Sequence, residues 1–93
     1  MALTSLRSSE KTFICYAGPN ATRVFLAGDF NDWRTAAAPM TKTNDGSWRA
    51  KARLAPGEHQ YKFIVDGQWV HDQAAERQVL NSYGTLNSVI RVS

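Results

Sequence analysis

Apolar and polar side chains alternate along much of this chain with the two-residue period of a β-strand. Residues 47–54 show the pattern most clearly, with Arg49, Lys51 and Arg53 falling between the apolar positions. Because successive side chains of a strand point to opposite faces, this segment predicts one wet face and one buried face. The predicted buried face is made of Trp48, Ala50, Ala52 and Leu54.

A second segment, residues 56–71, carries the dipeptide Asp66-Gly67 between two apolar runs. Asp-Gly is typical of two-residue hairpin turns, because both central positions need a positive φ. A turn at this point fixes which residues of the two strands lie opposite each other. The predicted pairs are Val65 with Gln68, Ile64 with Trp69, Phe63 with Val70, and Lys62 with His71.

Strand parity divides the side chains of this hairpin between two faces. The more apolar face, which we assign to the core, is made of Tyr61, Phe63, Val65 and Val70. Trp69 then faces solvent beside Ile64, with Lys62 one diagonal step away. An exposed indole next to an ammonium group on a rigid hairpin favours a role in recognition.

The rest of the chain alternates short strands with turn residues. Further strands are predicted for residues 12–16, 23–27, 40–43 and 89–92. The six glycines all fall at proposed turns, and their spacing indicates a small all-β sandwich or barrel. Residues 72–79 could begin a short helix at Asp72, but they lack an apolar stripe and we favour a loop.

The composition is that of an ordinary globular domain, with 43% apolar and 20% charged residues. A chain of 93 residues has room for one core. We therefore expect a flexible N-terminal tail at residues 1–10 and a single β-domain at residues 11–93. No apolar run approaches membrane-spanning length and the first residues resemble no secretory segment, so we expect no membrane partner. The single cysteine, Cys15, fits a reducing, cytoplasmic compartment and lies among apolar residues typical of a buried, inert thiol.

The residues needed for catalysis or metal binding are missing from the sequence. Only His59 and His71 could serve as an imidazole base, and no G-x-S-x-G motif or phosphate-binding loop accompanies them. One cysteine and two separated histidines do not make a metal site. Asp29 and Asp32 lie in a short surface loop that offers no cleft to raise the pKa of either carboxyl. We therefore expect no enzyme, no catalytic residue, no metal and no cofactor.

Several residues have side chains suited to binding a sugar. A flat tryptophan matches the apolar face of a pyranose ring, and Trp69 is the one that parity places outside. Trp33 ends a polar loop, where a structural role is the more common one for a lone tryptophan. Lysine and asparagine side chains complement sugar hydroxyls. The candidate polar residues are Lys62 and the run Tyr83-Gly84-Thr85-Leu86-Asn87.

Four sequence blocks occur in order: G-D-F-N-D-W at residues 28–33, D-G-S-W at 45–48, P-G-E-H-Q-Y-K-F-I-V-D-G-Q-W at 56–69 and G-T-L-N-S-V-I at 84–90. Together they resemble the family-48 carbohydrate-binding module over residues 13–92. This is the glycogen-binding domain of AMP-activated protein kinase β subunits, related to the N-terminal domains of isoamylases and branching enzymes. The resemblance implies an immunoglobulin-like antiparallel β-sandwich that binds α-1,4-linked glucans without catalysis.

The same resemblance implies a role for individual residues. Trp33 and Trp69 match the two tryptophans that stack on the sugar, and Lys62 matches the lysine that contacts its hydroxyls. Thr85 and Asn87 match the loop that hydrogen-bonds the glucan. Tyr83 replaces a leucine of the kinase subunits, and a tyrosine there adds a stacking surface. The resemblance and the strand parity agree that Trp69 and Lys62 face outward.

Two other functions remain open from the sequence. The chain could be an interaction module that packs against a catalytic domain or a kinase partner without binding sugar. It could also bind single-stranded nucleic acid through the basic stripe Arg49, Lys51 and Arg53, since its net charge is +3. Charges on the wet face of a strand more often serve solubility and discourage edge pairing. We therefore expect an α-glucan partner and no nucleic acid.

Overall fold

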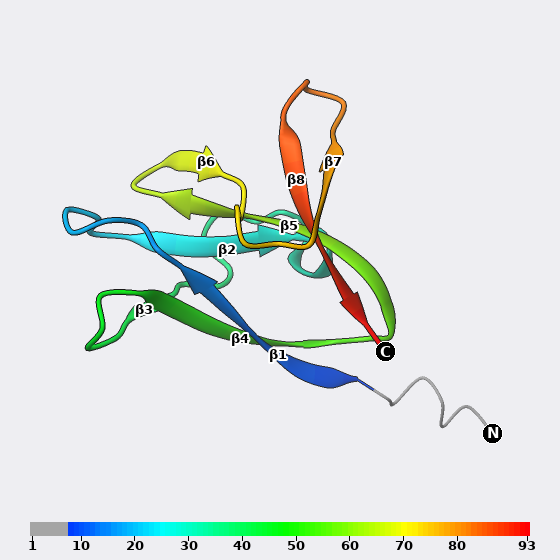
Figure 1. Ribbon diagram of the computed structural model, residues 1–93, viewed down its shortest axis with the longest axis horizontal. Coiled ribbons are helices and arrows are strands. Elements are labelled where there is room, and N and C mark those ends of the chain that lie inside the picture. The colour runs from blue at the N-terminus through cyan, green and yellow to red at the C-terminus, as the bar shows by residue number, and fades with distance from the viewer. Residues whose placement is uncertain (1–7) are drawn as a thin grey trace.

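Residues 8–93, the part of the chain that the computed structural model describes, form two antiparallel sheets (Figure 1). The smaller sheet has the order β1-β4-β3 and consists of β1 (Ser9–Cys15), β4 (Trp48–Leu54) and β3 (Thr41–Lys42). The larger sheet has the order β2-β5-β8-β7, with β6 also paired to β5. Its strands are β2 (Val24–Gly28), β5 (Gly57–Val65), β6 (Gln68–Val70), β7 (Arg77–Leu80) and β8 (Leu86–Val92). A 3₁₀ turn, η2 (Asp29–Asn31), follows β2. The predicted all-β, antiparallel sandwich is confirmed.

The core is built from apolar side chains of both sheets. The ring of Phe13 in β1 packs edge-on against Tyr61 in β5, with 4.8 Å between ring centroids. Tyr61 packs in turn against Phe63 at 5.8 Å. Trp48 and Leu54, the bulky ends of the alternating segment, are also buried, so the predicted inner face of β4 is confirmed.

The predicted hairpin at Asp66-Gly67 is present. Both turn residues have positive φ, 48° at Asp66 and 85° at Gly67, as a two-residue turn of this kind requires. Three of the predicted pairs form: Phe63 with Val70, Ile64 with Trp69, and Val65 with Gln68. The fourth, Lys62 with His71, does not form because β6 ends at Val70.

The core assignment of Val70 is wrong, since its side chain is 37% exposed. All three residues of β6 are exposed, because this short strand pairs with β5 at the margin of the sheet and adds nothing to the packed interior. Val65, on the same face, is half-buried against the core.

Several element boundaries differ from the sequence prediction. Strand β1 begins at Ser9, where Ser9 and Glu10 pair with Leu54 and Arg53, so these two residues do not belong to a tail. Of the rest of the predicted tail, Ser8 forms no strand, and residues 1–7 lie outside the described part of the chain. Strand β7 occupies Arg77–Leu80, so the segment favoured as a loop, residues 72–79, is a strand from Arg77 onward. Strand β8 begins at Leu86, three residues before the predicted strand.

Candidate functional site

The site lies where the larger sheet divides. One edge of β5 pairs with β2 through residues 61–65, while the other edge is shared by two strands. Residues 57–61 pair with β8 and residues 63–65 pair with β6, which leaves Lys62 at the junction. A pocket of about 960 Å³ lies over this junction and is lined by residues of β5, β6, β8 and the adjoining loops.

Trp33 reaches the pocket through a tightly folded turn after β2. The side chain of Asn31 accepts a hydrogen bond from Gly28 N (3.0 Å) and donates one to Leu26 O (3.1 Å), which closes η2 onto the strand. The chain then passes through two consecutive left-handed residues, Asp32 (φ 57°) and Trp33 (φ 58°). The backbone N–H of Trp33 donates to Gly28 O at 2.9 Å, so the indole is held at a fixed place beside the sheet.

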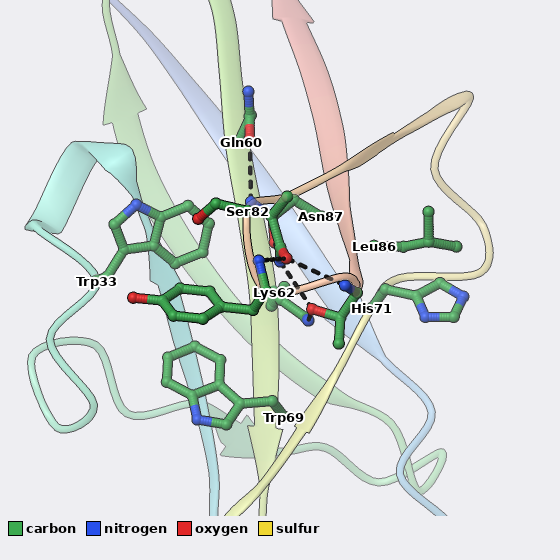
Figure 2. A pocket seen from close by; sticks show the side chains of 11 residues that line it. Trp33, Gln60, Lys62, Trp69, His71, Ser82, Leu86 and Asn87 are labelled. Atoms are coloured by element: carbon green, nitrogen blue, oxygen red, sulfur yellow. Dashed lines mark hydrogen bonds between the residues drawn. The ribbon is translucent and has the colours of Figure 1, made fainter.

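The two predicted tryptophans come together on one side of the pocket (Figure 2). Trp69 projects from β6 and is 46% exposed, as parity predicted, while Trp33 is half-buried. Their ring centroids are 6.4 Å apart and the ring planes are inclined by 51°. The two indoles therefore form one bent aromatic surface. Trp48, in contrast, lies in the core and takes no part in the site.

Lys62 lies on the predicted face of the sheet, but the expectation that it is open to solvent is wrong. Its residue exposure is 7%, and its Nζ donates a hydrogen bond to Thr85 Oγ1 at 3.0 Å. Burial lowers the pKa of the ammonium from its ordinary value. The loop between β7 and β8 covers this residue, and such a tertiary contact is invisible to strand parity.

The remaining predicted residues also line the pocket and come from the β7–β8 loop and the start of β8. Tyr83 is 90% exposed near the tip of that loop, which turns at Gly84 with φ 81°. Asn87 is buried, and its Nδ2 donates to Gln60 Oε1 at 3.0 Å. The structure therefore brings together Trp33, Lys62, Trp69, Tyr83, Thr85 and Asn87 at one pocket.

Five further residues line this pocket that were not among the six predicted site residues: Gln60, His71, Asn81, Ser82 and Leu86. Asn81 is the most connected of them, because its side chain bonds to backbone and side-chain atoms of the β7–β8 loop. Asparagine ahead of a glycine turn commonly makes such local bonds, so turn chemistry could have identified it.

The basic stripe of β4 belongs to the other sheet and does not reach the pocket. Arg49 pairs with Asp45 at 3.4 Å, Lys51 pairs with Glu10 at 3.9 Å, and Arg53 donates to Ser8 O at 3.3 Å. Each of the three basic side chains therefore has a polar partner of its own, and none of the three lines the pocket that the two tryptophans share.

No Asp or Glu side chain of residues 8–93 lines the pocket. Asp29 is engaged with Gln60 N (2.9 Å) and His59 Nδ1 (3.2 Å), and Asp32 lies 3.9 Å from Arg34 on the open surface. Among residues 8–93, no three His, Cys, Asp or Glu side chains gather closely enough to hold a metal ion. Within the same residues, no helix is long and apolar enough to cross a membrane.

Comparison with known proteins identifies the family. The model of the glycogen recognition site of AMP-activated protein kinase matches residues 10–93. The chain is 48% identical over 69 residues to 5′-AMP-activated protein kinase subunit beta-2 of Mus musculus, covering 74% of this chain and 24% of that protein. It is 45% identical over 69 residues to subunit beta-1 of Sus scrofa (74% and 53% covered) and to subunit beta-1 of Homo sapiens (74% and 24%). The chain thus spans about a quarter of the length of the mouse and human relatives. On the strength of a match over nearly its whole length, this chain belongs to the family of the glycogen recognition site of AMP-activated protein kinase.

Proposed function

We propose that this chain is a non-catalytic module that binds α-1,4-linked glucan, such as glycogen, starch or malto-oligosaccharides, at the Trp33–Trp69 surface. The observation that carries the proposal is the pair of indoles 6.4 Å apart, inclined by 51° and lining one open pocket. Sugar rings bury their apolar C–H faces on such rings at low entropic cost. An α-1,4-linked chain curves from one residue to the next, so a bent aromatic surface suits two neighbouring glucose units.

The polar residues beside the indoles complete this assignment. Lys62, Thr85 and Asn87 line the same pocket, and their N–H and O–H groups would bond to hydroxyls at the edge of a stacked sugar. Charge-assisted bonds from an ammonium to a hydroxyl oxygen are stronger than neutral ones. Tyr83 is almost fully exposed beside the pocket and offers a third aromatic surface to a bound chain.

We expect weak binding, roughly micromolar to millimolar, because an open surface buries little of the ligand. Calorimetric titration of the chain with maltoheptaose and with β-cyclodextrin tests the proposal, with tryptophan fluorescence as a second signal. A cello-oligosaccharide of similar length, whose β-linked chain is straight, is the matched control. A flat response at millimolar maltoheptaose would contradict glucan binding. Binding to single-stranded nucleic acid that weakens steeply with salt would instead favour the basic stripe.

The matched relatives are kinase subunits by name, and we therefore also propose that the chain contacts another protein. A kinase complex or a catalytic domain of a larger assembly is the proposed protein partner, and the cytoplasm is the proposed location. One structural observation supports a protein contact: Leu80 and Leu86 pair across β7 and β8 and are 72% and 37% exposed. Co-purification with a kinase partner in the absence of any glucan affinity would favour this alternative.

A further inference from the structure

Asn81 uses the whole hydrogen-bonding capacity of its side chain to organise one wall of the pocket, made of Lys62, Thr85 and Asn87. Its Oδ1 accepts bonds from the backbone N–H groups of Tyr83 (2.9 Å) and Thr85 (3.1 Å). Its Nδ2 donates to Thr85 Oγ1 (2.7 Å) and to Asn87 Oδ1 (2.9 Å). A primary amide offers two acceptor sites and two hydrogens, so these four bonds occupy all of them.

The direction of every bond in this network follows from the backbone. A backbone N–H can only donate, so the oxygen of Asn81 must face Tyr83 and Thr85, and its NH₂ group must face the other way. The atom of Asn87 opposite that NH₂ is therefore an oxygen. The NH₂ of Asn87 is then turned toward Gln60, whose Oε1 accepts it at 3.0 Å. Three side-chain amides are oriented in series by two backbone groups.

This orientation determines which atoms remain available to a ligand. Thr85 Oγ1 accepts one bond from Asn81 and one from Lys62 Nζ at 3.0 Å, which occupies both of its lone pairs. The Thr85 hydroxyl can then only donate. Lys62 retains two hydrogens, and one hydrogen of the Asn87 amide is not used within the described part of the chain. Each of these three side chains offers a hydrogen to the pocket.

We infer that Asn81 is a positioning residue that sets the polarity of this wall, so that it presents donors and selects hydroxyl oxygens of the ligand as acceptors. The inference rests on the proposed glucan binding and specifies how the sugar is recognised. A hydroxyl that meets this wall contributes its lone pairs, and its own hydrogen is directed to solvent.

The substitution Asn81→Asp separates this role from a merely structural one. Asp keeps the two acceptor sites for the N–H groups of Tyr83 and Thr85, so the turn retains its backbone bonds. It loses both donors, so Thr85 and Asn87 now donate to the new carboxylate. Lys62 still donates to one lone pair of Thr85 Oγ1, so the lone pair that Asn81 vacates becomes available to the pocket in place of the hydroxyl hydrogen. The polarity of the wall is then reversed at Thr85 and Asn87. A residue needed only for the turn would tolerate this change.

The experiment uses maltotriose and two sets of analogues, in which single hydroxyls are replaced by hydrogen or by fluorine, with affinities measured by calorimetry. Fluorine can accept a hydrogen bond but cannot donate one. For wild-type protein, we expect at least one position where the deoxy analogue loses about 10-fold in affinity, the value of one net hydrogen bond, while the fluoro analogue retains most of it. For Asn81→Asp, we expect weaker maltotriose binding and loss of the fluorine advantage at one or more of the positions where wild-type protein shows it, because Lys62 remains a donor while Thr85 and Asn87 do not.

Two results would overturn the inference. One is a wild-type protein for which no fluoro analogue binds better than its deoxy counterpart. The other is an Asn81→Asp variant with wild-type affinity and the wild-type order of analogues. The control is Asn44→Asp, because Asn44 is exposed in the turn before β4, away from the pocket. This variant introduces the same charge and should leave the maltotriose affinity and the order of the analogues unchanged. If unmodified maltotriose gives no binding signal with wild-type protein, the proposed function itself is contradicted. The analogue series tests only whether the wall presents donors or acceptors to the sugar.

Discussion

The indole rings of Trp33 and Trp69 lie with their centroids 6.4 Å apart although they belong to different segments of the chain. Each ring is held by a separate local device. Consecutive left-handed residues after η2 direct Trp33, and the parity of a two-residue hairpin directs Trp69. The separation is within the range of directly interacting aromatic pairs, so the two rings behave as one surface. A substitution that displaces one ring, through the turn after η2 or through the hairpin, should therefore also disturb the contact between the two rings.

Replacement of Trp69 by alanine should remove glucan binding with little effect on folding. Tryptophan residues at the centre of a binding surface contribute about 2 kcal/mol or more, which corresponds to roughly a 30-fold loss of affinity. The ring is 46% exposed, so the free energy of unfolding should fall by less than about 1 kcal/mol. Calorimetric titration with maltoheptaose measures the first effect and urea unfolding the second.

Replacement of Trp48 by alanine should instead damage the fold, because this indole lies in the core at 7% exposure. We expect a loss of about 3–5 kcal/mol in the free energy of unfolding. Its Nε1 is buried with no hydrogen-bond partner in the described part of the chain, so Trp48→Phe removes an unsatisfied donor and should cost much less. If Trp69→Ala proves more damaging to the fold than Trp48→Ala, the assignment of the two faces is wrong.

The features that could be predicted from the sequence are those set by neighbouring residues. The hairpin register follows from Asp66-Gly67 and the alternation beside it, and the buried face of β4 follows from its own period. Strand β7 was not predicted because its residues, Arg77–Leu80, carry little alternation of their own. Its pairing with β8 supplies the bonds that make it a strand.

The same division applies to the site. All six residues implied by the family resemblance lie at one pocket, and the outward position of Trp69 was also reached from parity alone. The burial of Lys62 could not be predicted, because the loop that covers it is brought there by the β7–β8 pairing. The role of Asn81 depends on the same loop. Residues whose environment is made by distant segments escape a strand-by-strand interpretation.

Acid should destabilise the fold through two turn carboxylates. The side-chain hydroxyls of Ser47 and Thr43 bond to Asp45 and hold the pKa of its carboxyl well below the usual range. The hydroxyl of Thr22 and the backbone N–H of Arg23 lower the pKa of Asp66 in the same direction. Because the folded pKa values lie below the unfolded value of about 3.9, this stabilisation is complete above that pH and is lost as the pH falls through the folded values.

The measurement is the urea midpoint between pH 6 and pH 2 for wild-type protein, Asp45→Asn and Asp66→Asn. We expect each variant to be less stable than wild-type protein at pH 6 and the difference to shrink toward pH 2. Glu76→Gln removes an exposed carboxylate that makes no hydrogen bond within the described residues and serves as the charge control. A difference that stays constant across the range would show that the turn bonds do not depend on ionisation.

The thiol of Cys15 should be unreactive while the protein is folded. Cys15 is 5% exposed in β1, and burial, with a smaller effect from the charge of Asp72, raises the pKa of the thiol to about 11. The reactive thiolate is therefore scarce at pH 8, and the sulfur is also shielded from reagents. Labelling with a thiol reagent should be slow in buffer and rapid in urea. Rapid stoichiometric labelling of the native protein would contradict the burial of Cys15 in the core.

Gly28 is the position at which the turn that carries Trp33 is most sensitive to substitution. Its backbone is extended at φ −166°, which any residue can adopt, so the constraint is space. A Cβ at this position would lie 2.5 Å from a ring carbon of Phe30 and 2.7 Å from Gln60 O. The first belongs to η2 and the second to β5, so an added methyl group forces the turn away from the strand.

We therefore expect Gly28→Ala to lower the free energy of unfolding by about 1–3 kcal/mol and to weaken maltoheptaose binding by displacing Trp33. Gly46→Ala is the control, because Gly46 has an open environment but a positive φ of 86° in the turn before β4. It should cost about 1 kcal/mol of stability through backbone strain and leave the affinity unchanged. The comparison separates a general loss of stability from displacement of Trp33. Equal affinities for both glycine variants would mean that sugar binding does not require Trp33 to be held against β5.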